Sequence, residues 1–385
     1  MSVGIAGAGA MGSGIAQIAA QNGEKVWVYD PFPEALQRSK TQLRAVLDRL
    51  VEKEKINAKQ AHSIENSIEY TTELSDLSHC ELIIEAIVER LETKQQLFEA
   101  LEERISDSCI LASNTSSISI ASLAKGRRLP QRILGIHFFN PAPLMPLVEI
   151  IPSLLTQPNV TQAAQNRIVK WGKTVVLAKD SPGFIVNRVA RPFYGEALKM
   201  LEEGVAEVNE IDTAMRTLGG FKMGPFELTD LIGHDVNYAV TETVWKQFFY
   251  DPRFKPSLIQ GRMVQAGLLG RKSGRGFYHY AEGEKIENTR VDSAKAEALF
   301  ERIFVMLVNE AYDALFLQIA SAQDIDLAMK LGLNYPKGLL QWSVDYGMPR
   351  ILAKLQSLHD WFGDDRYRPN PLLKHLVNTN STPFA

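Results

Sequence analysis

The chain has 385 residues, 45% of them hydrophobic, and its 42 Lys and Arg against 45 Asp and Glu leave a formal net charge of -3. This length predicts two or three domains with a large core. The near-neutral charge contains no block of one sign, which argues against binding to nucleic acid or to an anionic membrane. We therefore expect small molecules as partners.

Two further features indicate the cellular compartment. Cys80 and Cys109 are the only cysteines, and each lies in or beside an apolar stretch, which indicates reduced core thiols rather than disulfides or a metal site. The sequence runs from Met1 directly into a strand pattern, which leaves no room for a signal peptide, and no apolar run reaches membrane-spanning length. These observations predict a cytoplasmic protein with no bound metal.

The clearest local pattern is a dinucleotide-binding fingerprint near the N-terminus. A short apolar strand over residues 3–6 leads into Gly7-Ala-Gly9-Ala-Met11-Gly12, and a helical pattern and a second strand over residues 25–29 follow. The first glycine makes a tight turn, the second admits a pyrophosphate, and the third lets helix and strand pack closely. The free N–H groups at the start of the helix suit phosphates. We therefore predict a Rossmann-type domain whose cofactor site includes Gly7, Gly9, Met11 and Gly12.

Asp30 closes the second strand, eighteen residues after Gly12. A carboxylate at this position can accept hydrogen bonds from the hydroxyls of the adenosine ribose. It would also repel a 2′-phosphate, and residues 31–33 supply no arginine to offset that repulsion. The predicted cofactor is therefore NAD rather than NADP.

The rest of the first half alternates helix and strand patterns, as a parallel sheet requires. Helices are predicted as a projecting hairpin over residues 34–66 and at 94–105 and 161–171, and buried strands at 82–89, 110–112, 133–136 and 174–178. Ser116 and His137 fall just past the ends of two of these strands, at the carboxyl edge where ligands bind. We expect both side chains to face the same crevice as the glycine turn.

His137 and Glu149 have the residue types of a catalytic dyad. An imidazole can take a proton near neutral pH, and a carboxylate on its other nitrogen fixes the tautomer and stabilises the imidazolium. A buried histidine with a satisfied hydrogen bond is the alternative interpretation. Ser116 could complete a hydrolase triad with the dyad, but the chain has no G-x-S-x-G elbow, and a hydrolase would leave the dinucleotide fingerprint without a role.

The second half of the chain is predicted to be helical and to contain an internal repeat. Residues 211–212 recur as 325–326 and Gly224 recurs as Gly338, at an offset of 114. We therefore predict an α/β domain over 1–182 followed by two all-α copies over 183–280 and 292–385, joined by a polar linker over 281–292. The second copy has Glu301 where Asn187 would repeat, so it is predicted to be scaffold.

Five motifs, in this order, closely resemble the L-3-hydroxyacyl-CoA dehydrogenase family, and the resemblance covers nearly all of the chain. They are Gly7-Ala-Gly-Ala-Met-Gly-Ser-Gly-Ile-Ala16, Ser113-Asn-Thr-Ser-Ser117, His137-Phe-Phe-Asn-Pro141, Pro182-Gly-Phe-Ile-Val-Asn-Arg188 and Met223-Gly-Pro-Phe-Glu227. The duplicated helical domain and residues 365–372 are most similar to the two-repeat bacterial enzymes that act on 3-hydroxybutyryl-CoA or 3-hydroxyadipyl-CoA.

The resemblance implies NAD-dependent oxidation of a short-chain L-3-hydroxyacyl-CoA, or of 3-hydroxyadipyl-CoA, to the 3-oxoacyl-CoA. His137 would be the general base and Glu149 its partner. Ser116 would bond to the substrate, and Asn187 would be a polar contact brought by the helical domain.

The resemblance also implies further cofactor contacts and an assembly. Glu89 and Lys94 would lie near the cofactor ribose, Asn140 near the nicotinamide, and the Lys272 loop at the cleft. Single-repeat members of the family pair two chains through their helical domains. One chain would here supply both surfaces and form an intramolecular pseudo-dimer, which predicts a monomer.

Two alternatives from the same fold group remain open at this point. One is a dehydrogenase acting on a free sugar acid, although such relatives tend to lack the His-Phe-Phe-Asn-Pro run. The other is a non-catalytic binding or structural relative, against which the intact His137 and Glu149 pair argues.

Overall fold

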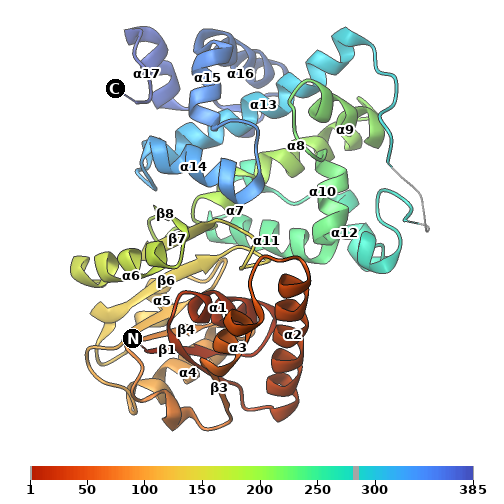
Figure 1. Ribbon diagram of the computed structural model, residues 1–385. Coiled ribbons are helices and arrows are strands. Elements are labelled where there is room, and N and C mark those ends of the chain that lie inside the picture. Colours follow the sequence, from red (N-terminus) through yellow and green to blue (C-terminus); the bar gives the residue numbers. More distant parts are fainter. Residues whose placement is uncertain (1, 281–285, 385) are drawn as a thin grey trace. The chain divides into compact units, whose positions relative to one another are not determined.

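The computed structural model describes residues 2–280 and 286–384. It divides into two compact units, the first ending at Ser181 and the second beginning at Pro182 (Figure 1). Both predicted helical copies fall within the second unit. Residues 281–285 of the predicted linker lie outside the described residues.

The first unit is built on one eight-stranded sheet, in the order β3-β2-β1-β4-β5-β6-β7-β8. Neighbouring strands run parallel except β6 and β7, which are antiparallel. The first six positions have the strand order of a dinucleotide-binding sheet. The strands are β1 (Ser2–Ala6), β2 (Lys25–Tyr29), β3 (Ile68–Thr71), β4 (Leu82–Glu85), β5 (Ile110–Ser113), β6 (Ile133–Phe138), β7 (Leu147–Pro152) and β8 (Thr174–Leu177).

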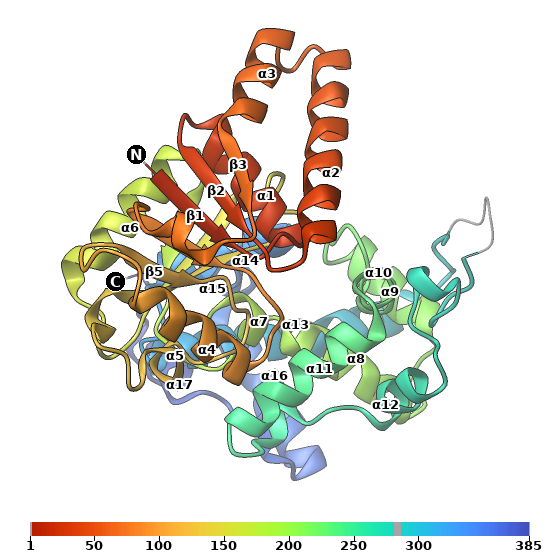
Figure 2. The same ribbon diagram turned by 90° about the horizontal axis from the view of Figure 1, so that it is seen from below.

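Helices cover this sheet and extend from it. They are α1 (Ala10–Gln21), α2 (Pro33–Glu52), α3 (Ala58–Asn66), α4 (Leu91–Glu102), α5 (Ile120–Ala124) and α6 (Pro158–Lys170), with short 3₁₀ turns η1 (Leu74–Leu77) and η2 (Pro130–Arg132). The predicted projecting hairpin is confirmed as α2 and α3, which stand away from the sheet in Figure 2. The side chains of Asn57 and Gln60 form a capping box that begins α3.

Several predicted boundaries are wrong. The strand expected over 82–89 ends at Glu85, so Glu89 lies in the loop before α4. His137 was expected just past a strand end but lies inside β6, because pairing with β7 extends β6 to Phe138. Strands β3 and β7 were not predicted. Each depends on a neighbour for its backbone hydrogen bonds, and that pairing is tertiary information.

In the described part of the second unit, residues 182–280 and 286–384, the regular elements are helices, beside short turns and two isolated bridges. They are α7 (Val186–Val189), α8 (Arg191–Glu202), α9 (Val208–Thr217), α10 (Pro225–Ile232), α11 (His234–Gln247), η3 (Pro252–Phe254), α12 (Leu258–Gln265), η4 (Arg271–Ser273), α13 (Ser293–Phe316), α14 (Ala322–Leu333), α15 (Leu339–Tyr346), α16 (Met348–Phe362), η5 (Asp365–Tyr367) and α17 (Pro371–Thr379). The prediction of helices from 185 to 277 is therefore confirmed as far as Gln265, but it is wrong beyond that point, where η4 and two isolated bridges follow. The long helix α13 packs on α8 and α9 and forms the centre of this unit.

Two features of the second unit occur twice. The Asp212 carboxylate accepts hydrogen bonds from the backbone amides of Phe226 and Glu227 at the start of α10. The Asp326 carboxylate accepts the same two bonds from Leu340 and Gln341 at the start of α15. In both places a buried aspartate satisfies amides that a helix cannot bond internally.

The described residues contain neither a membrane-spanning helix nor a metal-binding cluster. Over residues 2–280 and 286–384, none of the helices combines the length and apolar character needed to cross a bilayer. In the same residues no three His, Cys, Asp or Glu side chains come together in a way that would hold a metal ion.

Candidate active site

The glycine turn after β1 has the geometry of a phosphate-binding loop. Gly7 has a φ of +113°, and a Cβ at Gly12 would lie 1.9 Å from the carbonyl oxygen of Gly7, so neither position tolerates a side chain. A Cβ at Gly9 would meet no atom within 4 Å, so that side of the turn is open. Helix α1 begins at Ala10, and its first amides have no acceptor within the helix. An anionic pyrophosphate fits this opening.

Asp30 lies beside the same turn. Its Oδ2 accepts a hydrogen bond from the amide of Ala8 at 2.9 Å, and its Oδ1 accepts one from the amide of Phe32 at 3.1 Å. A cavity of about 490 Å³ opens here, and Gly7, Gly9 and Asp30 line it. Met11 packs partly buried against the core of the first unit. The cavity is therefore suited to an adenosine that emerges from the glycine turn.

His137 and Glu149 form a buried pair. They are direct partners in the antiparallel pairing of β6 with β7, so their side chains project from the same face. His137 Nδ1 lies 2.7 Å from Glu149 Oε2. The two residues are 5% and 0% exposed, so little water competes for this contact. The two predicted residues are therefore in contact within one hairpin, and their catalytic role stays a prediction.

A second polar cluster joins the loops after β4 and β5. The buried Lys94 Nζ lies 2.6 Å from Glu85 Oε1 and 3.1 Å from Glu89 Oε2. Glu89 Oε1 accepts hydrogen bonds from the Thr115 hydroxyl at 2.6 Å and the Ser116 amide at 2.9 Å. Burial disfavours the charge of Glu89, but Lys94 and these hydrogen bonds outweigh it and lower the pKa of Glu89. Ser116, Glu89 and Lys94 therefore lie together, and their roles at the substrate and the cofactor ribose stay predictions.

Two residues of this region were missed by the sequence analysis. Glu85 is fully buried, and its Oε2 accepts a hydrogen bond from the Ser113 hydroxyl at 2.6 Å; burial raises the pKa of Glu85 despite the nearby Lys94. Asn114 Oδ1 accepts a bond from the amide of Phe138 at 2.8 Å, which ties the Ser113-Asn114-Thr115 loop to the strand of His137. The signal for both was a polar residue at the carboxyl end of an apolar strand.

The other predicted residues lie elsewhere. Asn140 is exposed in the turn after β6. Asn187 belongs to α7 of the second unit, where its backbone carbonyl accepts a hydrogen bond from Arg191 Nε at 2.8 Å. Lys272 lies in η4 of that unit and forms an ion pair with Asp235. The approach of Asn187 and Lys272 to the site on the first unit stays a prediction.

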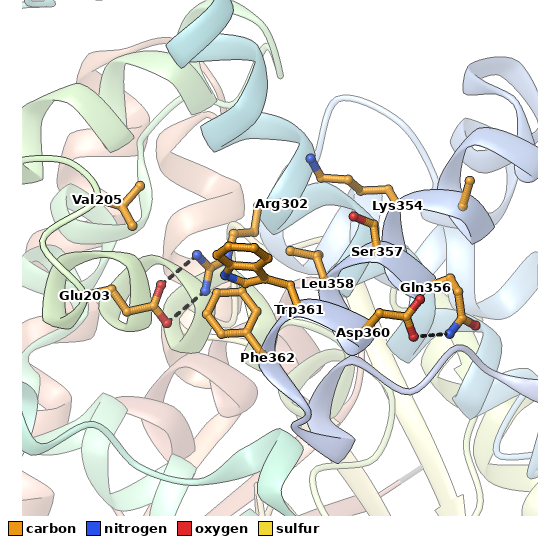
Figure 3. A pocket seen from close by; sticks show the side chains of 11 residues that line it. Glu203, Val205, Arg302, Lys354, Gln356, Ser357, Leu358, Asp360, Trp361 and Phe362 are labelled. Carbon is orange, nitrogen blue, oxygen red and sulfur yellow. Dashed lines mark hydrogen bonds and ion pairs between the residues drawn. The ribbon is translucent and has the colours of Figure 1, made fainter.

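A larger hollow of about 980 Å³ lies in the second unit, along α16 (Figure 3). Arg302 and Lys354 are cations at its wall, and two hydrogen bonds from the Arg302 guanidinium already engage the carboxylate of Glu203. The indole of Trp361 lies at the same hollow and is 83% exposed. The lining contains no histidine that could form a pair like that of His137 and Glu149, so we place the chemistry in the first unit.

An open glycine turn and a histidine able to accept a proton, both at the carboxyl edge of one sheet, are the requirements of a nicotinamide-dependent dehydrogenase. Comparison with known families gives a narrower assignment. Residues 2–181 match the model of the 3-hydroxyacyl-CoA dehydrogenase NAD binding domain, and residues 183–280 and 299–383 match that of the 3-hydroxyacyl-CoA dehydrogenase C-terminal domain. The chain therefore belongs to the 3-hydroxyacyl-CoA dehydrogenase family.

Individual relatives agree with this assignment. The chain is 37% identical to a 3-hydroxyadipyl-CoA dehydrogenase of Escherichia coli (strain K12), over 97% of this chain and 96% of the relative. It is 43% identical to a probable 3-hydroxybutyryl-CoA dehydrogenase of Deinococcus radiodurans, over 73% of this chain and 100% of the relative. The crystal structure of a 3-hydroxybutyryl-CoA dehydrogenase from Escherichia coli K12 is similar with a TM-score of 0.94 and 37% identity, covering 99% of both chains.

These findings decide between the functions that the sequence left open. The protein is an NAD-dependent oxidoreductase that acts on the hydroxyl group of a 3-hydroxyacyl-CoA. The serine hydrolase, the sugar-acid dehydrogenase and the non-catalytic relative are therefore wrong as descriptions of this chain.

Proposed function

We propose that His137 is the general base in the oxidation of an L-3-hydroxyacyl-CoA to the 3-oxoacyl-CoA. The observation that carries this assignment is the 2.7 Å contact between His137 Nδ1 and Glu149 Oε2 in a buried hairpin. With Nδ1 held by the carboxylate, Nε2 is the nitrogen that takes the proton of the 3-hydroxyl. Glu149 stabilises the imidazolium that results, and in the reverse reaction His137 returns the proton.

The remaining side chains orient the reactants. Ser116 donates a hydrogen bond to the substrate oxygen at C3, and Asn187 adds a polar contact from the second unit. When bound, NAD⁺ would supply the acceptor for the hydride from C3. The dyad itself takes only the proton of the hydroxyl, so oxidation of this carbon needs no covalent bond to the enzyme.

We assign the cofactor to the glycine turn and the two polar clusters. Gly7, Gly9, Met11 and Gly12 would surround the pyrophosphate, and Asp30 would accept hydrogen bonds from the adenosine ribose. Glu89 and Lys94 would lie at the other ribose, Asn140 at the nicotinamide, and Lys272 at the cleft. The open space at Gly9 and the amide-anchored carboxylate of Asp30 support this orientation.

We infer a short-chain 3-hydroxyacyl-CoA, or 3-hydroxyadipyl-CoA, as the substrate. The similarity to the 3-hydroxyadipyl-CoA dehydrogenase of Escherichia coli and to the probable 3-hydroxybutyryl-CoA dehydrogenase of Deinococcus radiodurans supports this choice. A panel of L-3-hydroxyacyl-CoA substrates of rising chain length, with and without a distal carboxylate, tests it by the absorbance of NADH. The highest kcat/KM is expected with 3-hydroxybutyryl-CoA or 3-hydroxyadipyl-CoA. A maximum at long acyl chains would contradict the substrate assignment, and absence of NADH with every member would contradict the dehydrogenase reaction.

We also propose that the second unit is a duplicated helical domain folded as an intramolecular pseudo-dimer. Arg188 Nε binds Glu310 at 2.7 Å, and Arg302 Nε binds Glu196 at 2.7 Å. Each residue of one pair lies 114 positions from a residue of the other, so the two ion pairs cross reciprocally, as in an isologous interface. The guanidinium of each arginine also packs over a phenylalanine, Phe248 at 4.8 Å and Phe362 at 4.7 Å. The two separate matches to one C-terminal domain family support the same duplication.

The duplication supports domains over 1–182, 183–280 and 292–385, with the last copy as scaffold. A pseudo-dimer within one chain would leave no need for a second chain, so we infer a monomer. Cys80 and Cys109 are both free and buried thiols, which is consistent with the reducing cytoplasm that we propose as its compartment.

A further inference from the structure

The cavity beside Asp30 is lined by a cationic side chain that lies outside residues 31–33. Arg38 lies in α2, eight positions after Asp30, and it lines the same cavity as Asp30 and Phe32. Its side chain is exposed, and within residues 2–280 and 286–384 it makes no hydrogen bond or ion pair. A long, exposed guanidinium side chain at the wall of a nucleotide cavity can reach a phosphate inside it.

Asp30 and Arg38 act on a 2′-phosphate in opposite directions. Both oxygens of Asp30 are held by backbone amides, so the carboxylate is fixed where ribose hydroxyls would meet it. A phosphate on the 2′-oxygen would place two like charges together. Arg38 offers the opposite charge and a planar pair of N–H donors suited to phosphate oxygens.

We propose that Arg38 forms a latent 2′-phosphate site, and that Asp30 alone excludes NADP from this cavity. This inference rests on the proposed role of Asp30 at the adenosine ribose. It follows that removal of the Asp30 carboxylate creates affinity for a 2′-phosphorylated nucleotide, and that this affinity requires Arg38.

Binding of nucleotide fragments tests the proposal without any need for turnover. The probes are 2′,5′-ADP, which carries the 2′-phosphate, and 5′-ADP, which lacks it. Calorimetry with the full-length wild type, Asp30→Ser, Arg38→Ala and the double variant measures both affinities. Lys40→Ala is the matched control, because Lys40 is an exposed cation of the same helix that does not line the cavity.

Asp30→Ser should strengthen binding of 2′,5′-ADP relative to 5′-ADP by about tenfold or more. Adding Arg38→Ala should remove about tenfold or more of that gain, the usual effect of losing a charge-assisted hydrogen bond. Adding Lys40→Ala to Asp30→Ser should keep the gain. Equal 2′,5′-ADP affinity of Asp30→Ser with and without Arg38 would overturn the proposal.

The phosphate of the substrate is the other ligand that Arg38 could serve, because CoA carries a ribose phosphate of its own. Steady-state kinetics separates the two sources. If Arg38→Ala raises the KM for acyl-CoA at saturating NAD and leaves the ratio of 2′,5′-ADP to 5′-ADP affinity unchanged in the Asp30→Ser background, Arg38 belongs to the CoA phosphate and the proposal is wrong. Wild-type turnover with NAD in the same assay shows that the dehydrogenase assignment survives that outcome.

Discussion

His137 and Glu149 are opposite residues of one antiparallel strand pair, and their side chains meet at 2.7 Å. The backbone pairing of β6 with β7 therefore brings the carboxylate and the imidazole together. Both groups are buried, so the ring is held at one orientation by the carboxylate rather than by solvent. A base held in this way meets each substrate with the same nitrogen and needs no reorganisation.

The first prediction concerns His137→Gln. Loss of the general base should lower kcat by about 10²–10⁴, while NAD binding, measured by fluorescence titration, should change little. His62→Gln is the matched control, because His62 is exposed on α3. Near-normal turnover of His137→Gln at saturating substrate would remove His137 from the proton transfer.

The second prediction concerns Glu149→Gln. An amide can still hydrogen-bond to the imidazole, but it cannot stabilise the positive charge that develops on the ring. We expect kcat to fall by at least about tenfold, but by no more than it falls in His137→Gln, where the base itself is lost. Thermal unfolding should be recorded alongside, since Glu149 is fully buried. A variant that is stable and fully active would show that the carboxylate only packs beside His137.

Much of the first unit could be predicted because its local patterns are strong. The glycine turn, Asp30 at the end of β2 and the hairpin of α2 and α3 all follow from short-range spacing. The position of His137 within β6 could not be predicted from the sequence, because Phe138 becomes part of the strand only through its pairing with Val148.

The polar cluster around Lys94 shows a second limit of sequence reasoning. Glu85 and Ser113 end neighbouring strands, and their 2.6 Å contact depends on the register of β4 with β5. Arg38 is similar, because its place at the Asp30 cavity depends on how α2 leaves the sheet. A sequence pattern predicts on which side of a helix a residue lies, but tertiary packing sets the distance from that residue to the other wall of a cavity.

The third prediction concerns the thiols. Burial raises the pKa of Cys80 and the pKa of Cys109 to about 12, so at pH 8 both thiols stay protonated and therefore weakly nucleophilic. Native protein should react slowly with a chromogenic disulfide reagent, and both thiols should react on unfolding. Ser108→Cys provides an exposed thiol as a control. Rapid reaction of both native cysteines would contradict their burial.

The fourth prediction concerns the crossed ion pairs. Arg302→Met leaves Glu196 buried without its closest cation and should lower the free energy of unfolding by about 3–5 kcal/mol. Lys246→Met removes an exposed pair with Glu242 and should cost less than about 1 kcal/mol. Denaturant titrations of both variants measure the difference. Equal effects of the two substitutions would show that the Arg302 pair does not stabilise the second unit.

The last prediction concerns the assembly. Helix α13 buries Val305, Leu307 and Val308 completely and packs on α8 and α9, so under the proposed duplication the second copy would cover apolar surface of the first. A chain shortened after Tyr280 should expose that surface and either aggregate or form a true dimer. The full-length chain should instead be a monomer by light scattering coupled to size exclusion. An obligate dimer of full-length chains joined through these same helices, or a shortened chain that stays soluble and monomeric, would contradict the pseudo-dimer, because either result would mean that the second copy does not replace a partner chain.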